Sequence, residues 1–383
     1  MPLHFSLAEL AERRRRTCEA ITAKGLDGLM MFRQESMFYL TGYDTFGYCF
    51  FQCMYLGADG RLILLTRAPD LRQAQFTSMV EDIRIWVDSP TAGPADQLRD
   101  ILEECGHRGG RLGVEWDAYG LTAANGRKVD GALNDFCELE DGSDLVNELR
   151  IVKSPAEIEF VREAAKLTDD AYDAAVELTG TGASEGDILA AMQGAVFQGG
   201  GDYAGNEFII GSGDGALMCR YYSGRRTMTA QDQLTLEWAG AYRHYHAAMM
   251  RTFVVGEVPA RQQALYDASL DALRAVEAAI IPGRTFGDGF DAHARVMDGA
   301  GLAEHRLNAC GYSLGTTFSP TWMDWAMMYQ GNARVFEPGM VIFCHMIIFD
   351  SDAALAMTLG ETVLVTETGN DRLSRSPLDL VVK

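Results

Sequence analysis

The sequence divides at a helix start near its middle, Ser154-Pro155-Ala156-Glu157. Ser154 suits the N-cap, Pro155 suits the first helical position, and Glu157 supplies the acid of a capping box. Apolar residues follow at helical spacing as far as residue 168. Because 383 residues are more than one hydrophobic core usually organises, we interpret this helix as the entry to a second domain.

The two sides of this junction differ in pattern. Before it, apolar runs typical of strands, such as 25–32 and 61–66, alternate with helical segments such as 94–105. After it, helices are predicted at 184–197, 260–280 and 286–299, a strand pair at 234–255, and further strands over the last hundred residues. We therefore expect an α/β domain over residues 1–145 and an α+β domain over residues 146–383.

The charge of the chain excludes several classes of partner. Thirty-three basic and 54 acidic side chains give a net charge of −21, which repels phosphate backbones and anionic lipids. The longest apolar run, 340–349, is too short to span a bilayer. The eight cysteines include no CxxC pair, and the first residues lack the order of a secretory signal. We expect a cytoplasmic protein that binds neither nucleic acid nor membrane.

Several segments, in this order, resemble the creatinase–aminopeptidase superfamily. They are GLDGLMMFRQESMFYLTGY at 25–43, the junction ELRIVKSPAEIEFVREAAKLTDDAY, and then IIGSGD, MMRTFVVG, GYSLG, EPGMV and ETVLVTETG. The resemblance covers nearly the whole chain. It implies a small creatinase-type amino-terminal α/β domain followed by a catalytic domain of the pita-bread fold.

Peptidases of this superfamily hold two metal ions with two Asp, one His and two Glu. The resemblance places these five positions on Glu237, Ala248, Tyr312, His345 and either Gly360 or Glu361. Two hard cations need several oxygen ligands, and at most Glu237, His345 and Glu361 could still bind one. We therefore expect no metal and no other cofactor.

The resemblance is closer to the metal-independent ectoine hydrolase and creatinase branch. The segment EWAGAYRHYHAAMMRTF is similar to the ectoine hydrolase pattern E-I-A-G-x-Y-R-R-Y-H-x-x-x-x-R-T. Tyr312 stands where the peptidases have His, as it does in that branch. Arg220 departs from the ectoine hydrolases and from creatinase, which have a His after the SG segment, and this departure leaves the substrate open.

Four residues are the candidate catalytic groups. A carboxylate inside the apolar strand LTLEWAG is costly without partners, so Glu237 is either a nucleophile or base, or a structural acid paired with Arg243 or Arg251. His246 is either a proton shuttle or a hydrogen-bonded turn residue. His345, inside VIFCHMIIF, is either a core residue or an acid–base group. Glu361 is its expected partner.

The candidate substrate-binding residues are mostly aromatic. Aromatic faces suit cations and flat delocalised groups, although each ring could equally be core, and Arg220 could clamp a carboxylate or form a surface ion pair. Tyr39 and Tyr43 are expected to form a lid over a partner's site in a homodimer, an arrangement that the resemblance implies. The set comprises Tyr312, Trp322, Asp324, Trp325, Tyr242, Arg220 and Tyr39.

The function expected from these residues is metal-independent hydrolysis of a C–N bond. The substrate would be a small zwitterionic molecule resembling ectoine, creatine or a betaine. Two alternatives stay open: an Xaa-Pro dipeptidase with one residual metal, and a non-catalytic pita-bread binding protein.

Overall fold

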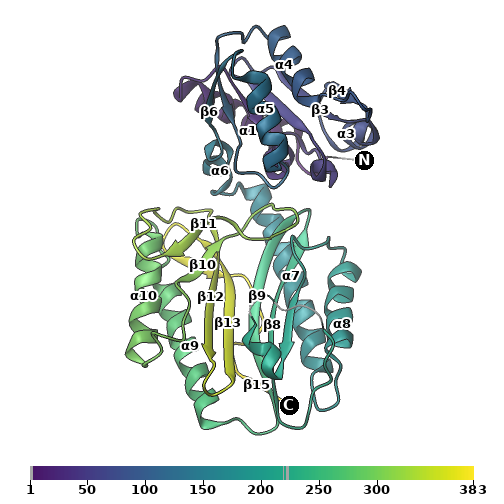
Figure 1. Ribbon diagram of the computed structural model, residues 1–383. Helices are drawn as coiled ribbons and strands as arrows, with labels where there is room; N and C mark the ends of the chain where they lie inside the picture. Colours follow the sequence, from purple (N-terminus) through teal and green to yellow (C-terminus); the bar gives the residue numbers. More distant parts are fainter. Residues whose placement is uncertain (1–2, 219, 221–223) are drawn as a thin grey trace. The chain divides into compact units, whose positions relative to one another are not determined.

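The structure, a computed structural model, describes residues 3–218, 220 and 224–383 (Figure 1). The chain forms two compact units that meet between Arg150 and Ile151. The division therefore falls after Arg150 rather than after residue 145. Among the described residues, no helix is long and apolar enough to cross a bilayer.

The first unit is an α/β domain built on a six-stranded sheet in the order β4-β3-β2-β1-β5-β6. Only β2 runs antiparallel to its neighbours. Apolar residues of the strands pack against the helices on both faces of this sheet, as its two core clusters show. The strands are β1 (Gly28–Met31), β2 (Cys53–Gly57), β3 (Leu62–Arg67), β4 (Asp82–Trp86), β5 (Arg111–Val114) and β6 (Glu138–Asp141). The helices are α1 (Leu7–Ala23), α2 (Gln34–Thr41), α3 (Leu71–Thr77), α4 (Pro94–Glu104), α5 (Ala123–Leu133) and α6 (Leu145–Arg150).

The prediction that Tyr39 and Tyr43 form an aromatic lid is wrong. Tyr39 lies in α2, fully buried in the core of this unit, with Arg13 stacked over its ring. Tyr43 is equally buried. Neither ring is available to a substrate. The aromatic side chains that this unit does expose nearby are Phe46, 75% exposed, and Phe50, 44% exposed.

The second unit is a curved sheet with four helices on one side (Figure 1). Its main path is β11-β10-β12-β13-β9-β8-β7, with the short strands β14 and β15 pairing with β13 and β9. The strands are β7 (Ile209–Ser212), β8 (Asp232–Tyr242), β9 (Tyr245–Val255), β10 (Ala309–Ser313), β11 (Asp324–Tyr329), β12 (Val341–Asp350), β13 (Leu355–Val365), β14 (Asn370–Arg372) and β15 (Val381–Val382). The helices are α7 (Pro155–Leu178), α8 (Glu185–Gln198), α9 (Ala260–Ala279) and α10 (Phe286–Gly299).

Side-chain alternation gives this sheet two unlike faces. On the helix face, Cys344 and Met346 of β12 and Leu359 of β13 pack with α9 and α10 in one apolar cluster. The residues between them, including His345 and Gly360, point to the opposite face, which we call the site face. Each position on these strands is therefore assigned to the core or to the site by its parity.

The entry helix α7 begins where the sequence predicts. The Ser154 side chain accepts the Glu157 N–H, and the Glu157 carboxylate accepts the Ser154 N–H, which completes the capping box. Glu157 also accepts a hydrogen bond from the Tyr245 hydroxyl at 2.7 Å. The same carboxylate thus caps α7 and attaches it to β9.

Glu361 lies on the helix face and not in the site. Its carboxylate is fully buried and pairs with the Arg251 guanidinium and, at 3.0 Å, with Arg372 Nε. Arg251 lies in turn over the ring of Tyr172 in α7. The expectation that Glu361 is a catalytic partner of His345 is therefore wrong, because the two side chains leave opposite faces of the sheet.

We predict that Glu361→Ala destabilises the second unit without removing any group from the site face. The change leaves two guanidinium groups near a buried site without their anion, which costs about 3–5 kcal/mol. Urea unfolding followed by circular dichroism measures the loss. The exposed Glu367→Ala, in the turn after β13, is the matched control and should change stability by less than about 0.5 kcal/mol. Equal stabilities of the two variants would contradict this account of Glu361.

Candidate active site

The centre of the site face is one row of residues across four strands. Glu237 of β8 pairs with Met250 of β9, Met250 pairs with Gly360 of β13, and Gly360 pairs with His345 of β12. Glu237 and His345 are thus the two polar side chains at the ends of this row. Between them lie a thioether and a glycine.

This register decides between the two alternatives for the fifth metal-ligand position. Gly360, and not Glu361, faces the site, so the five positions hold Glu237, Ala248, Tyr312, His345 and Gly360. Only one carboxylate and one imidazole remain as ligands of ordinary strength. Among the residues that the structure describes, no three His, Cys, Asp or Glu side chains form a group able to hold a metal ion. The donor set does not fit a dinuclear centre.

Two successive hydrogen bonds connect Glu237 on β8 with residues at the other end of the sheet, on the same face. The Trp322 indole Nε1–H donates to the Tyr312 hydroxyl at 2.9 Å, and this hydroxyl donates to Glu237 Oε1 in a long bond of 3.3 Å. Trp322 and Tyr312 are 1% and 2% exposed. Trp322 thus contacts Tyr312, and Tyr312 contacts Glu237; substrate contact by the two rings stays a prediction.

The surroundings of Glu237 change its acidity. Burial raises the pKa of this carboxyl to about 7, while the Arg220 guanidinium and the Tyr312 hydrogen bond oppose the rise. Arg220 lies in the turn after the short helix Gly213–Leu217 and is exposed. Glu237 therefore changes charge near neutral pH, as a catalytic base or nucleophile does.

His345 is buried next to the hydrogen-bonded residues Tyr312 and Glu237. Its ring centroid lies 5.5 Å from that of Tyr312, and its Nδ1 has no hydrogen-bond partner among the described residues. Burial lowers the pKa of His345 to about 3. The imidazole is therefore neutral at physiological pH, and it can offer a hydrogen bond more readily than it can take up a proton.

Glu237 also borders a small apolar hollow of about 20 Å³. Sheet residues form its floor, and Ala216 and Met218 cover it from the segment after β7. A space of this size holds roughly one water or one methyl group. The other described lining residues are Ile209, Thr235, Leu236, Met250, Ile347, Phe349 and Thr358.

His246 has a structural role, which corrects its assignment as a catalytic residue. Its Nε2 accepts the Gly205 N–H at 2.9 Å, and its Nδ1 lies 3.1 Å from the Thr317 hydroxyl and 3.4 Å from the Gly315 carbonyl. The ring is fully buried, and burial lowers its pKa to about 4. With both nitrogens occupied by fixed partners, His246 connects two loops, 202–208 and 314–323, to β9 and has no free position for a substrate proton.

Three further candidates have contacts elsewhere in the second unit. Tyr242, at the end of β8, packs edge-on against Phe160 of α7. Trp325 packs against the helix-face core. Asp324 accepts the Trp325 N–H at 2.9 Å, and its Oδ2 adjoins Gly315. Substrate binding by these three residues stays a prediction.

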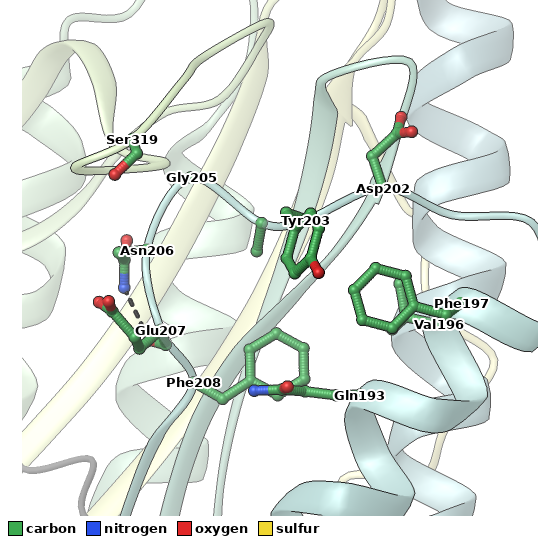
Figure 2. Close-up of a pocket in the computed structure, with 11 residues that line it drawn as sticks. Gln193, Val196, Phe197, Asp202, Tyr203, Gly205, Asn206, Glu207, Phe208 and Ser319 are labelled. Carbon is green, nitrogen blue, oxygen red and sulfur yellow. Dashed lines mark hydrogen bonds between the residues drawn. The ribbon is translucent and has the colours of Figure 1, made fainter. Parts of the chain in front are cut away.

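A cavity of about 390 Å³ lies apart from the polar cluster. It lies between α8, the loop 202–208 and Ser319 (Figure 2), and none of Glu237, His345 or Tyr312 lines it. Glu237 stays the candidate reacting group, because the altered acidity and the converging polar groups are there. The loop nevertheless supports the site: Asn206 Oδ1 accepts the Trp322 backbone N–H at 3.1 Å.

Sequence reasoning missed Asn206 and the residues of the hollow. Asn206 stands just before the landmark segment IIGSGD, and only this closeness in sequence could have indicated that it supports the site. Ile209, Met250 and Ile347 have no polar chemistry that would distinguish them from core residues. The candidates that the structure brings together are Glu237, His345, Tyr312, Trp322 and Arg220.

Comparison with known proteins agrees with this architecture. Residues 13–152 match the creatinase/prolidase N-terminal domain, and residues 159–367 match metallopeptidase family M24. Over its whole length the chain is 29% identical to y4tM of Sinorhizobium fredii, an uncharacterized hydrolase/peptidase, and 27% identical to the ectoine hydrolase of Halomonas elongata, covering 99% of each. It is 28% identical to the Xaa-Pro dipeptidase of Pyrococcus furiosus, over 75% of this chain and 78% of that protein.

Solved structures show the same fold. A prolidase from Thermococcus sibiricus superposes with a TM-score of 0.89 at 18% identity, over 99% of this chain and 100% of that one. Dipeptidase PepE from Mycobacterium ulcerans gives 0.85 at 23% identity, over 99% of both chains. Since the M24 match covers more than half of the sequence, the chain belongs to metallopeptidase family M24, with a creatinase-type domain before its pita-bread domain.

Proposed function

We propose that this M24 hydrolase cleaves a C–N bond of a small zwitterionic molecule, of the ectoine, creatine or betaine kind, without a metal ion. The observation that carries the proposal is the content of the five metal-ligand positions, where Ala248 and Gly360 provide no ligand and the Tyr312 hydroxyl is engaged with Glu237. The full-length similarity to an ectoine hydrolase supports the reaction class. The free cysteines of the described residues fit a reducing, cytoplasmic location.

The described side chains fit three roles. Ionised Glu237 either takes a proton from the attacking water and passes it to the leaving nitrogen as the C–N bond breaks, or attacks the electrophilic carbon itself. In the second case one water gives its proton to the leaving nitrogen and its hydroxyl to the carbon, which breaks the bond to Glu237. His345, neutral and with Nδ1 unpartnered, can hydrogen-bond to the substrate. Arg220, whose charge reaches Glu237, can hold a substrate carboxylate.

We predict turnover of a zwitterionic solute that survives metal removal. The protein is purified without added metal, its metal content is measured by elemental analysis, and ectoine, creatine, betaines and Xaa-Pro dipeptides are assayed with and without chelator. Because Glu237 must be ionised, kcat/KM should rise as pH increases through about 7. Glu237→Gln should lower kcat by at least about 10³-fold.

Two outcomes would contradict this proposal. Stoichiometric metal with chelator-sensitive cleavage of Xaa-Pro dipeptides would assign the activity of the dipeptidase relatives instead. Thermal stabilisation by a compound that is never turned over would indicate a non-catalytic binding protein.

We also propose a homodimer in which the exposed aromatic residues Phe46 and Phe50 of one subunit cover the site of its partner. Covering the site would exclude water and strengthen the interactions of Glu237. The exposure of these two rings, in contrast to Tyr39 and Tyr43, supports them as the covering residues.

We predict that subunit mixing restores activity. Glu237→Ala and the double variant Phe46→Ala/Phe50→Ala should each be inactive or nearly so. Random exchange of the two should recover about a quarter of wild-type activity, since half of the dimers then hold one intact site. A fully active monomer by light scattering, or mixtures no more active than their components, would reject the shared site.

A further inference from the structure

We propose that Trp322 and Tyr312 are positioning residues that hold Glu237 by Oε1 and leave Oε2 to meet the substrate. This inference deepens the proposed function and rests on it for the identity of Glu237 as the reacting group. It changes the role of the two rings, which act through Glu237 and not through contact with the substrate.

The direction of the hydrogen-bond chain follows from the groups in it. An indole N–H can only donate, so the Tyr312 oxygen accepts from Trp322 at 2.9 Å. The phenol has a single proton, and Glu237 Oε1 lies within its reach at 3.3 Å. An ionised carboxylate can only accept. The proton of Tyr312 is therefore committed to Oε1 whenever Glu237 is charged.

The second oxygen of Glu237 is left available. Among the described residues, Oε2 has no hydrogen-bond partner, and it is not one of the buried unpaired atoms. It is therefore the oxygen open to a ligand. A carboxylate with one oxygen held by a hydrogen bond is already oriented before the substrate binds. It therefore loses little conformational entropy on binding, which favours a reactive geometry.

Both positioning rings are held independently of Glu237. Asn206 Oδ1 fixes the backbone of Trp322 from the loop shown in Figure 2. Tyr312 pairs with Phe343 in the sheet, and the two ring centroids lie 5.3 Å apart. Two separate parts of the fold, the loop with Asn206 and the strand with Phe343, thus position the Tyr312 hydroxyl.

The contact between Tyr312 and Glu237 spans most of the sheet. Tyr312 lies on β10 and Glu237 on β8, with β12, β13 and β9 between them. Their side chains meet over the site face. Beside them, the Phe343 ring fills the space next to Gly360, where an added Cβ would come within 2.8 Å of it.

The test measures the protonation of Glu237 directly, without a substrate. Infrared difference spectra of each protein against its Glu237→Gln form report the protonated carboxyl of this residue during a pH titration. The charged and titratable groups described around it are Arg220, Tyr312 and His345. His345 stays neutral across the neutral range, so the titration reports Glu237.

Tyr312→Phe should move the Glu237 midpoint upward by at least about half a pH unit, because the lost bond favours the charged form. The acid limb of kcat/KM should move with it. Trp322→Phe, which frees the Tyr312 oxygen, should shift the midpoint in the same direction by less and serves if Tyr312→Phe does not fold. The control is Tyr329→Phe, on the partly exposed end of β11.

The outcomes separate this inference from the proposed function. An unchanged midpoint in both folded variants, with KM alone raised, would make the rings substrate contacts and overturn the inference. A shifted midpoint in a protein that turns over no compound would support the positioning role while removing the proposed reaction.

Discussion

The hydrogen bond from Tyr312 to Glu237 is the contact on which the rest of the site depends. A carboxylate on a largely apolar sheet face is costly to ionise, and the row beside it contains only Met250, Gly360 and His345. In the peptidase members of the superfamily, two metal ions stabilise the ionised carboxylate at this position. Here the charge of Arg220 and, after it, the hydrogen bond from Tyr312 offset only part of the cost of burial, so the pKa of Glu237 is about 7, above the ordinary range of a glutamate.

The frame around this contact serves a different purpose from the contact itself. Glu157 joins the start of α7 to β9, His246 joins two loops to β9, and Glu361 joins β13 to β9 and β14. These three side chains are polar and buried, which makes them look like catalytic groups in a sequence. Each contacts protein partners, and these contacts hold strands, loops and the entry helix of the second unit together.

Much of the fold could be predicted, because its signals are local or carried by a whole series of segments. The capping box at residues 154–157 depends on neighbouring residues alone, and the ordered landmarks fixed the pita-bread assignment. The position of Glu237 could be predicted for the same reason. The role of Glu361 could not, since a one-residue difference in register moves a side chain to the other face of a sheet. Tyr39 and Tyr43 likewise differ from Phe46 and Phe50 only in burial, which is a property of the packed core.

The composition of the site face also limits how this protein could change over evolutionary time. A dinuclear metal centre of the peptidase kind would need acids at Ala248, His345 and Gly360 and a histidine at Tyr312. An acid placed at Gly360 alone would put its Cβ 2.8 Å from the Phe343 ring and add a second anion to the site of Glu237. Replacing Tyr312 alone would remove the hydrogen-bond donor of Glu237. Each of these two changes is therefore unfavourable when it is made first.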